Sequence, residues 1–119
     1  MAHGSYNAYV DVIRRNDAEL GLLWKGVQDD PALRDSTTLF LLPEFGRDAN
    51  LNQRNGLDHG DSSEDLGRTA CIAAGPNVVR GKTYDTMVDA IDVAPTVGAL
   101  MGFRTEEARG KPIRSILKA

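Results

Sequence analysis

The chain has 119 residues, which is enough for one ordinary domain or for a piece of a larger one. Its hydrophobic content of 41% can support a core and argues against wholesale disorder. A net charge of −3 gives no basic surface for nucleic acid or anionic lipid, and no apolar stretch reaches the roughly 18 residues of a transmembrane helix.

Residues 6–29 have the apolar spacing of an amphipathic helix. Steps of three, four and seven residues place these side chains on one stripe: Tyr6, Tyr9, Val10, Ile13, Leu20, Leu23, Trp24 and Val27. Ser5 stands directly before this segment and is typical of a cap or a turn. Pro31 ends the helix, because a residue that precedes a proline avoids the α region.

Residues 38–42, TLFLL, form a short and uninterrupted apolar run that stops at Pro43. Its length and its abrupt end predict a strand buried on both faces, as in a parallel sheet. Residues 43–67 then form a long loop rich in Gly, Asn, Asp and Ser. A loop of this length inside a compact domain is usually functional or disordered, so we treat it as the candidate active-site loop.

Residues 69–74 form a second apolar run, which ends at a Gly-Pro pair and predicts another strand. Within it lies Cys71, the only cysteine, so an internal disulfide and a thiolate metal cluster are excluded. Its apolar neighbours predict that Cys71 is a small residue of the core. Residues 83–88 predict a third, edge-like strand.

The last long element is a helix over residues 92–101. Asp92 is expected to cap its start, Pro95 lies in its first turn, and Gly102 follows its end. Residues 113–117 predict a final helical or 3₁₀ turn. The order helix, strand, loop, strand, strand, helix predicts an α/β layer fold in a single domain, 1–119.

Glu44 and His59 are the candidate metal ligands of this fold. Ligands bind beyond the carboxyl ends of strands in α/β sheets, where Glu44 and the long loop are expected. A carboxylate with an imidazole suits Zn²⁺ or Mn²⁺, but two ligands do not complete a site. Further candidate ligands are His3, Asp48, Asp58 and Asp61. The alternative is that Glu44 simply ends a strand in water and that His59 is an ordinary loop residue.

Arg47 is the candidate anion-binding residue, because a guanidinium matches phosphate or sulfate with two parallel hydrogen bonds. A surface ion pair with Asp48 or Glu44 is the equally plausible alternative. No Walker loop, nucleophile elbow, HExxH or CxxC motif is present.

Several segments, in this order, resemble the carboxy-terminal part of the alkaline phosphatase superfamily, which includes sulfatases, type I phosphodiesterases and phosphonoacetate hydrolases. They are a strand followed by PEFGRD, a loop with His-Gly, and the stretches AAGPNVVRG, DAIDVAPTVGALMGF and GKPIRSIL. The resemblance covers residues 3–117. The EFGR spelling is closer to a less characterised, sulfatase-like branch.

The resemblance implies a three-layer sheet with helices on both faces, of which only the carboxy-terminal part is present. It implies a metal-dependent hydrolase of phosphate or sulfate esters, with Zn²⁺ or Mn²⁺ in a single, incomplete site. The residues that it assigns are His3, Glu44 and His59 as metal ligands and Arg47 near the substrate anion.

Three departures from the family pattern shape the expected activity. The Asp that the family pairs with the His at position 3 would lie upstream of Met1. Phe45 stands where the family usually has a second metal-binding His. The family's nucleophile belongs to an amino-terminal part that this chain lacks, so no catalytic residue is assigned and the chain alone is expected to be inactive. We expect exposed sheet edges, with self-association or pairing with the missing part. The alternative is a non-catalytic family member, or a small α/β module, that binds an anion or a partner chain.

Overall fold

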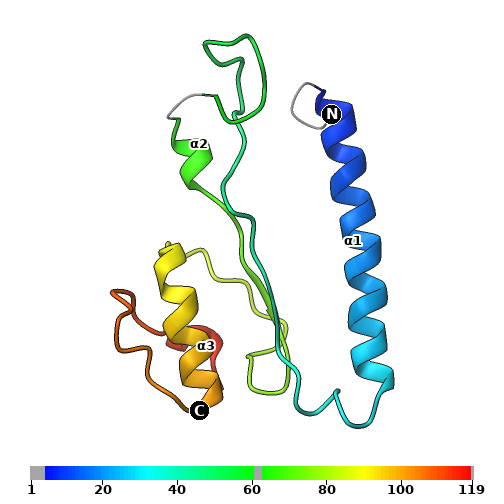
Figure 1. Cartoon of the computed structure of the whole chain (residues 1–119), viewed down its shortest axis with the longest axis vertical. Helices are drawn as coiled ribbons and strands as arrows, with labels where there is room; N and C mark the ends of the chain where they lie inside the picture. Colours follow the sequence, from blue (N-terminus) through cyan, green and yellow to red (C-terminus); the bar gives the residue numbers. More distant parts are fainter. Residues whose placement is uncertain (1–4, 61–62, 119) are drawn as a thin grey trace.

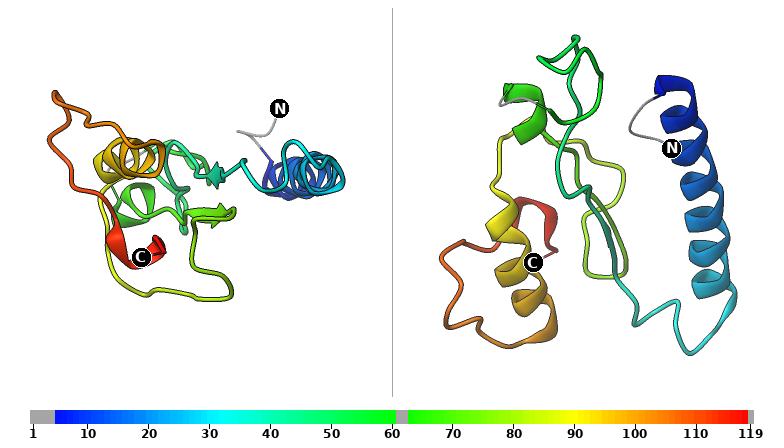
Figure 2. Two further views of the ribbon diagram at one scale, coloured as in Figure 1. Left: turned by 90° about the horizontal axis from the view of Figure 1, so that it is seen from below. Right: turned by 45° about the horizontal axis from the view of Figure 1, so that its top comes forward.

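The computed structural model describes residues 5–60 and 63–118 and has a mixed α/β structure (Figure 1). The helices are α1 (Tyr6–Asp29), α2 (Glu64–Gly67) and α3 (Val93–Met101), the strands are β1 (Leu39–Leu41) and β2 (Ile72–Ala74), and the 3₁₀ turns are η1 (Ala90–Asp92) and η2 (Arg114–Ile116). Helices α1 and α3 lie on opposite sides of a ribbon formed by the two strands (Figures 1 and 2). His3 and Asp61, two of the candidate ligands, lie outside the described residues.

Helix α1 covers the residues that the apolar spacing indicates. The hydroxyl of Ser5 accepts a hydrogen bond from the backbone N–H of Ala8 (3.3 Å), and Pro31 follows the end of the helix. No residue of α1 is buried, and Leu22 and Leu23 are 65% and 58% exposed. The apolar stripe therefore lacks most of the cover that a helix of this pattern finds in a globular domain. In the described part of the chain, no helix is both long enough and apolar enough to cross a membrane.

The two strands pair antiparallel, with Leu39 opposite Ala74, Phe40 opposite Ala73 and Leu41 opposite Ile72. The prediction of a strand buried on both faces of a parallel sheet was therefore wrong. The connecting segment leaves β1 and enters β2 at the same end of the ribbon, which requires antiparallel pairing. Both strands are also shorter than the predicted runs.

The expected burial of the ribbon was wrong as well. Leu41 is 40% exposed, Ile72 is 60% exposed, and the Cys71 thiol is exposed rather than part of a core. Side chains of a strand project from the two faces of a sheet, and no helix in the described part of the chain packs closely on either face of this ribbon, which explains the difference.

The predicted strand at residues 83–88 was also wrong, because residues 82–89 have no regular structure. Tyr84, Met87 and Val88 are all exposed. An edge strand forms only beside a neighbouring strand, and the described sheet contains β1 and β2 alone. The apolar side chains of this segment were therefore a weak indicator of strand structure.

The small core of the molecule lies between α3 and the C-terminal segment. Val78 and Ile113 are the buried hydrophobic residues of the described chain, and Thr96 is fully buried beside them. The Thr96 hydroxyl donates to the Asp92 carbonyl oxygen (2.6 Å) and accepts from the Ile113 N–H (2.8 Å). A bridge between Val78 and Leu117 closes the unit. The stretches around APT and GKPIRSIL therefore pack against each other.

Asp92 begins α3, but its side chain does not cap this helix. The carboxylate instead accepts from the backbone N–H groups of Asp89 (3.2 Å) and Lys111 (2.8 Å). Asp89 caps the preceding turn η1 in a reciprocal capping box with Asp92. Gly102 ends α3 in the left-handed conformation, with φ of 77°, as its position after the helix indicates.

Candidate functional site

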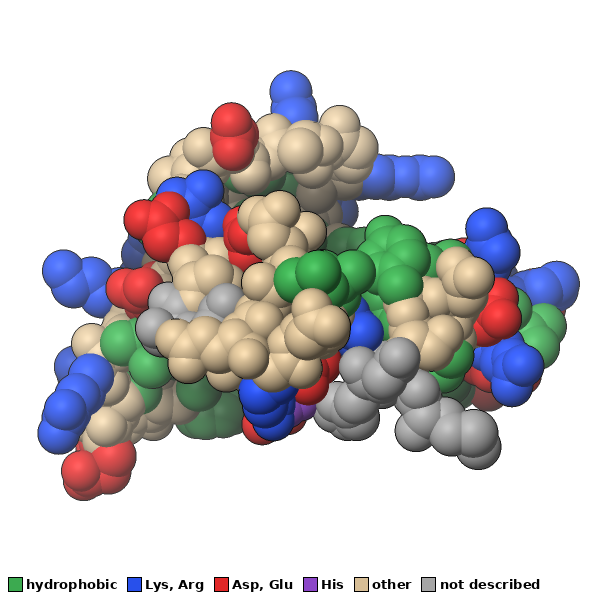
Figure 3. Space-filling view, turned by 90° about the horizontal axis from the view of Figure 1, so that it is seen from above, with side chains coloured by type: hydrophobic (Ala, Val, Ile, Leu, Met, Phe, Trp, Pro, Cys, Tyr) green, Lys and Arg blue, Asp and Glu red, His purple; other side chains and the backbone are tan. Residues whose placement is uncertain are grey.

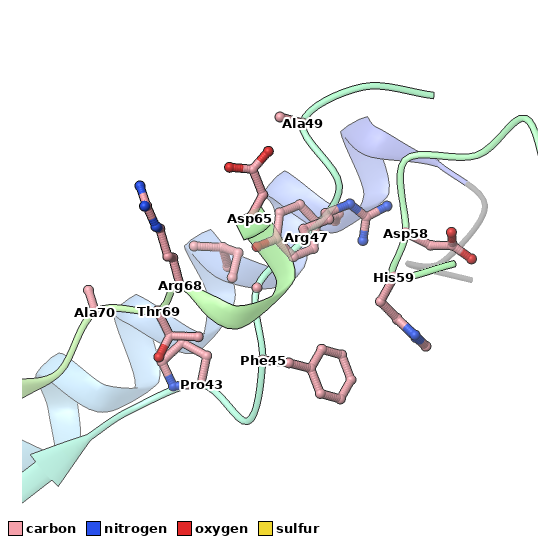
Figure 4. Close-up of a pocket in the computed structure, with 13 residues that line it drawn as sticks. Pro43, Phe45, Arg47, Ala49, Asp58, His59, Asp65, Arg68, Thr69 and Ala70 are labelled. Atoms are coloured by element: carbon pink, nitrogen blue, oxygen red, sulfur yellow. The ribbon is translucent and has the colours of Figure 1, made fainter. Parts of the chain in front are cut away.

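A cleft of about 600 Å³ lies beyond the carboxyl end of β1, where α1 approaches the long loop (Figure 4). Its lining comes from α1, the segment after β1, α2 and the start of the chain toward β2. The polar and aromatic residues that line it are Tyr9, Phe45, Arg47, Asp58, His59, Asp65, Arg68 and Thr69. The cleft is at the end of β1 where the sequence predicted a ligand site, although the rule behind that prediction holds for parallel sheets and this ribbon is antiparallel.

Residues 46–60, which we call the cleft loop, are held in shape by a buried carboxylate. Asp48 is only 5% exposed. Its carboxylate accepts hydrogen bonds from the Asn52 side-chain amide (2.7 Å), the Gly60 backbone N–H (3.0 Å) and the Ser63 hydroxyl (3.2 Å). Its backbone N–H donates to the Asp58 carbonyl oxygen (2.9 Å). Asp48 therefore joins the two ends of the cleft loop and is committed to structure.

Asn52 completes this network from the middle of the cleft loop. Its amide nitrogen also donates to the Asp58 carboxylate, and its amide oxygen accepts from the backbone N–H groups of Arg54 (2.9 Å) and Gly56 (3.1 Å). The Arg54 guanidinium reaches the other oxygen of Asp58 at 2.9 Å. The hydrogen bond from Asn52 lowers the pKa of Asp58, partial burial opposes this effect, and the charge of Arg54 lowers the pKa further.

Two glycines allow the close approaches on which the cleft loop depends. A Cβ atom at Gly46 would lie 1.9 Å from the Asp65 carbonyl oxygen, and the Gly46 N–H donates to Leu66 O (2.8 Å). A Cβ atom at Gly60 would lie 2.5 Å from the amide nitrogen of Asn52. The glycine of EFGR, Gly46, is therefore explained by its packing against α2. The glycine of His-Gly, Gly60, is explained by its close approach to the Asp48 network.

His59 lies beside Phe45 in the cleft. The two ring centroids are 4.8 Å apart, and the ring planes are inclined by 55° (Figure 4). The family resemblance leads us to expect a second metal-binding His at position 45. The structure has the ring of Phe45 there, in contact with the His59 imidazole. The hydrophobic face of Phe45 restricts the imidazole on one side.

Arg47 is held against α1. Its guanidinium carbon lies 4.2 Å from the centroid of the Tyr9 ring, a cation–π contact that connects the cleft loop to the first helix. A guanidinium carries N–H donors that match an anion bidentately, and Arg47 is an arginine that lines the cleft. Arg68, which pairs with Glu64 at 3.1 Å, lines the opposite end of the same cleft.

The structure brings some of the predicted site residues together. His59 and Arg47 both line the cleft, whereas Glu44 is exposed and is not among the lining residues. Asp48, considered above as a ligand, is instead engaged within the cleft loop. The sequence did not indicate Tyr9 or Arg68 as site residues. Tyr9 could have been recognised only as a member of the helix stripe, and nothing near Arg68 marks it as part of a site.

Within residues 5–60 and 63–118, no group of three His, Cys, Asp or Glu side chains could hold a metal ion. Glu44 and His59 therefore do not form a complete metal site with the rest of the described chain. A divalent ion at this position would need ligands from elsewhere.

Comparison with known proteins identifies no relative. No family model and no curated protein matches the sequence, and no solved structure matches the fold. The family resemblance therefore stays a prediction that rests on the motifs and their order.

Proposed function

We propose that this chain is the carboxy-terminal part of a metal-dependent hydrolase of phosphate or sulfate esters, and that its cleft binds the anionic group of the ester. The observation that carries the proposal is the position of Arg47, stacked on Tyr9 and lining a cleft that it shares with His59. A guanidinium held in this way is suited to a tetrahedral oxyanion.

The arrangement of the elements supports the same proposal. A ribbon with α1 on one side and α3 on the other is what the carboxy-terminal part of a three-layer fold would contribute (Figure 2). The cleft lies beyond the end of β1, where the cleft loop begins. The EFGR and His-Gly motifs supply its arginine and its histidine.

A bound Zn²⁺ or Mn²⁺ would supply Lewis-acid activation of the ester, and His59 is the predicted ligand that lines the cleft. Of the other two predicted ligands, Glu44 is outside the cleft lining and His3 is outside the described residues. Because the described residues do not complete such a site, we assign the remaining ligands and the nucleophile to a missing amino-terminal part. The role of this chain alone is to recognise the anion and orient it, without catalysis.

Replacement of Arg47 tests anion binding directly. We expect inorganic phosphate and sulfate to bind to the wild-type chain and Arg47→Gln to weaken this binding by about tenfold or more, since a hydrogen bond to a charged group contributes about 1.5–3 kcal/mol. The measurement is a titration followed by NMR shifts of the His59 imidazole and of the Gly46 and Gly60 amides.

Arg14→Gln is the matched control, because Arg14 is a highly exposed arginine of α1 that does not line the cleft. It should leave phosphate binding unchanged. Equal binding by the wild type and Arg47→Gln would contradict the proposal, and equal weakening by both variants would show only a general charge effect and would also contradict it.

A non-catalytic module that binds an anion or a partner chain is the second candidate, favoured by the lack of a three-ligand group in the described chain. Titration with Zn²⁺ separates the two candidates. A site that uses His59 takes up the ion stoichiometrically, and His59→Ala reduces this uptake. A non-catalytic module shows no stoichiometric uptake, while Arg47 still binds phosphate.

A further inference from the structure

The molecule exposes far more surface than a compact protein of its mass. Its accessible surface is 9377 Å², whereas a folded monomer of 12.9 kDa exposes about 6,300 Å². The radius of gyration is 16.8 Å, against about 13.5 Å for a compact chain of this length. Roughly 3,000 Å² of surface is therefore available for burial in an assembly.

Much of this surface is apolar. Exposed large hydrophobic side chains occur on α1, on the ribbon and on the segment around α3; among them are Tyr6, Ile13, Leu22, Leu23, Leu41, Leu42, Ile72, Met87, Ile91, Met101 and Phe103. Figure 3 shows apolar side chains at the surface between charged ones at the end of the molecule that carries the start of α1. Exposed apolar surface on this scale marks an interaction site.

The free edge of β1 is where a regular interface can form. Among the described residues, β1 pairs with β2 and with no other strand. Residues 36–43, STTLFLLP, contain no charged side chain, so β1 lacks the lysines and glutamates that usually protect an edge from pairing with another chain. Strand β2 has one large apolar side chain, the exposed Ile72, beside Ala73 and Ala74. Strand β1 has three, Leu39, Phe40 and Leu41, and therefore offers the larger apolar area to a partner strand.

We propose that a second copy of this chain pairs with β1 along this edge. Antiparallel pairing about a two-fold axis places Phe40 opposite its counterpart and Leu39 opposite Leu41, so that each apolar residue meets an apolar residue. No like charges oppose each other, because the edge is uncharged. The result is a four-stranded sheet in the order β2, β1, β1, β2.

The positions of the helices agree with this geometry. A two-fold axis perpendicular to the sheet brings both copies of α1 to one face and both copies of α3 to the other, because these helices lie on opposite sides of the ribbon (Figure 1). Obligate dimers bury about 2,000–5,000 Å² in total, and the excess surface of two chains is sufficient for this.

The mass of the full chain in solution tests the proposal. Sedimentation equilibrium is expected to give twice 12.9 kDa for the wild type. Leu41→Lys places a charge on each side of the two-fold axis and should sediment as a monomer. Met87→Lys is the matched control, since Met87 is an 83% exposed apolar residue outside the ribbon, and it should remain a dimer.

A disulfide cross-link provides a second test that does not depend on the folding of Leu41→Lys. Opposed residues of antiparallel strands have Cα atoms about 4.5–5.5 Å apart, which suits a disulfide. Phe40→Cys in a Cys71→Ser background should oxidise to a covalent dimer, whereas Met87→Cys in the same background should not. A monomeric wild type, a dimer that Leu41→Lys leaves intact, larger irregular aggregates, or equal cross-linking at both positions would each overturn the proposal.

Discussion

At the scale of single residues, Asn52 organises the cleft loop. Its side chain is 7% exposed and makes hydrogen bonds with both oxygen and nitrogen. It donates to the carboxylates of Asp48 and Asp58 and accepts from two backbone N–H groups. Because the amide stands between two carboxylates, it both satisfies the buried Asp48 and keeps Asp58 charged without repulsion.

Asn52→Ala is expected to destabilise the chain by about 1–3 kcal/mol, because the buried Asp48 loses a donor and two backbone N–H groups lose their acceptor. It should also raise the pKa of Asp58 from its lowered value, since the hydrogen bond from Asn52 is the main cause of the lowering. Urea denaturation and a ¹³C carboxyl titration measure the two effects. Asn50→Ala, at an exposed asparagine of the same loop, is the control and should change neither.

The lowered pKa of Asp58 also fixes the direction of the pH dependence. Its contribution to stability is fully present above the ordinary value of 3.8 and is lost as the pH falls through the lowered pKa. In the same titration, the wild-type cleft loop should therefore keep its structure to lower pH than Asn52→Ala. If the wild-type cleft loop lost its structure at the same pH as Asn52→Ala, or at a higher pH, the assigned network would be wrong.

At the scale of elements, local signals predicted α1 and α3, but they did not predict the short helix α2, which lies in the segment 43–67 that was expected to be a loop. The strand pairing could not be predicted from local signals either. Helix α1 follows from its apolar spacing with Ser5 and Pro31 at its ends, and Gly102 marks the end of α3. Neither the antiparallel ribbon nor the Asp48 network could be predicted, because each depends on residues brought together by the fold. The apolar run before Pro43 indicated a strand correctly but its burial wrongly, since burial depends on which elements pack on the faces of the sheet.

The packing of α3 on the C-terminal segment depends on one hydroxyl. Thr96→Val keeps the shape of the side chain but removes the acceptor of the buried Ile113 N–H. The expected loss in the free energy of unfolding is about 1–3 kcal/mol, measured by urea denaturation, with faster hydrogen exchange of the Ile113 amide. Thr83→Val, at an exposed threonine in the irregular segment, should change neither quantity. Unchanged exchange at Ile113 in Thr96→Val would exclude this role for the hydroxyl.

At the scale of the whole molecule, the buried core is too small for the length of the chain. Val78 and Ile113 are the buried hydrophobic residues of the described part, and the rest of the apolar surface lies on α1, the ribbon and the flanks of α3. Hydrophobic burial is the main favourable term in folding, so a single copy gains little from it. Pairing through β1 supplies the missing burial, which couples folding to association.

This coupling makes the stability depend on chain concentration. The melting temperature should rise as the concentration increases over a roughly hundredfold range, because association stabilises the folded state by mass action. The urea m-value should rise with it, since m scales with the surface exposed on unfolding and the dimer buries more surface than the monomer. Leu41→Lys should melt at one low temperature with a shallow transition at every concentration, whereas Met87→Lys should follow the wild type. A wild-type chain that melts steeply at a temperature independent of concentration would show that one copy folds by itself, and the burial argument would then be wrong.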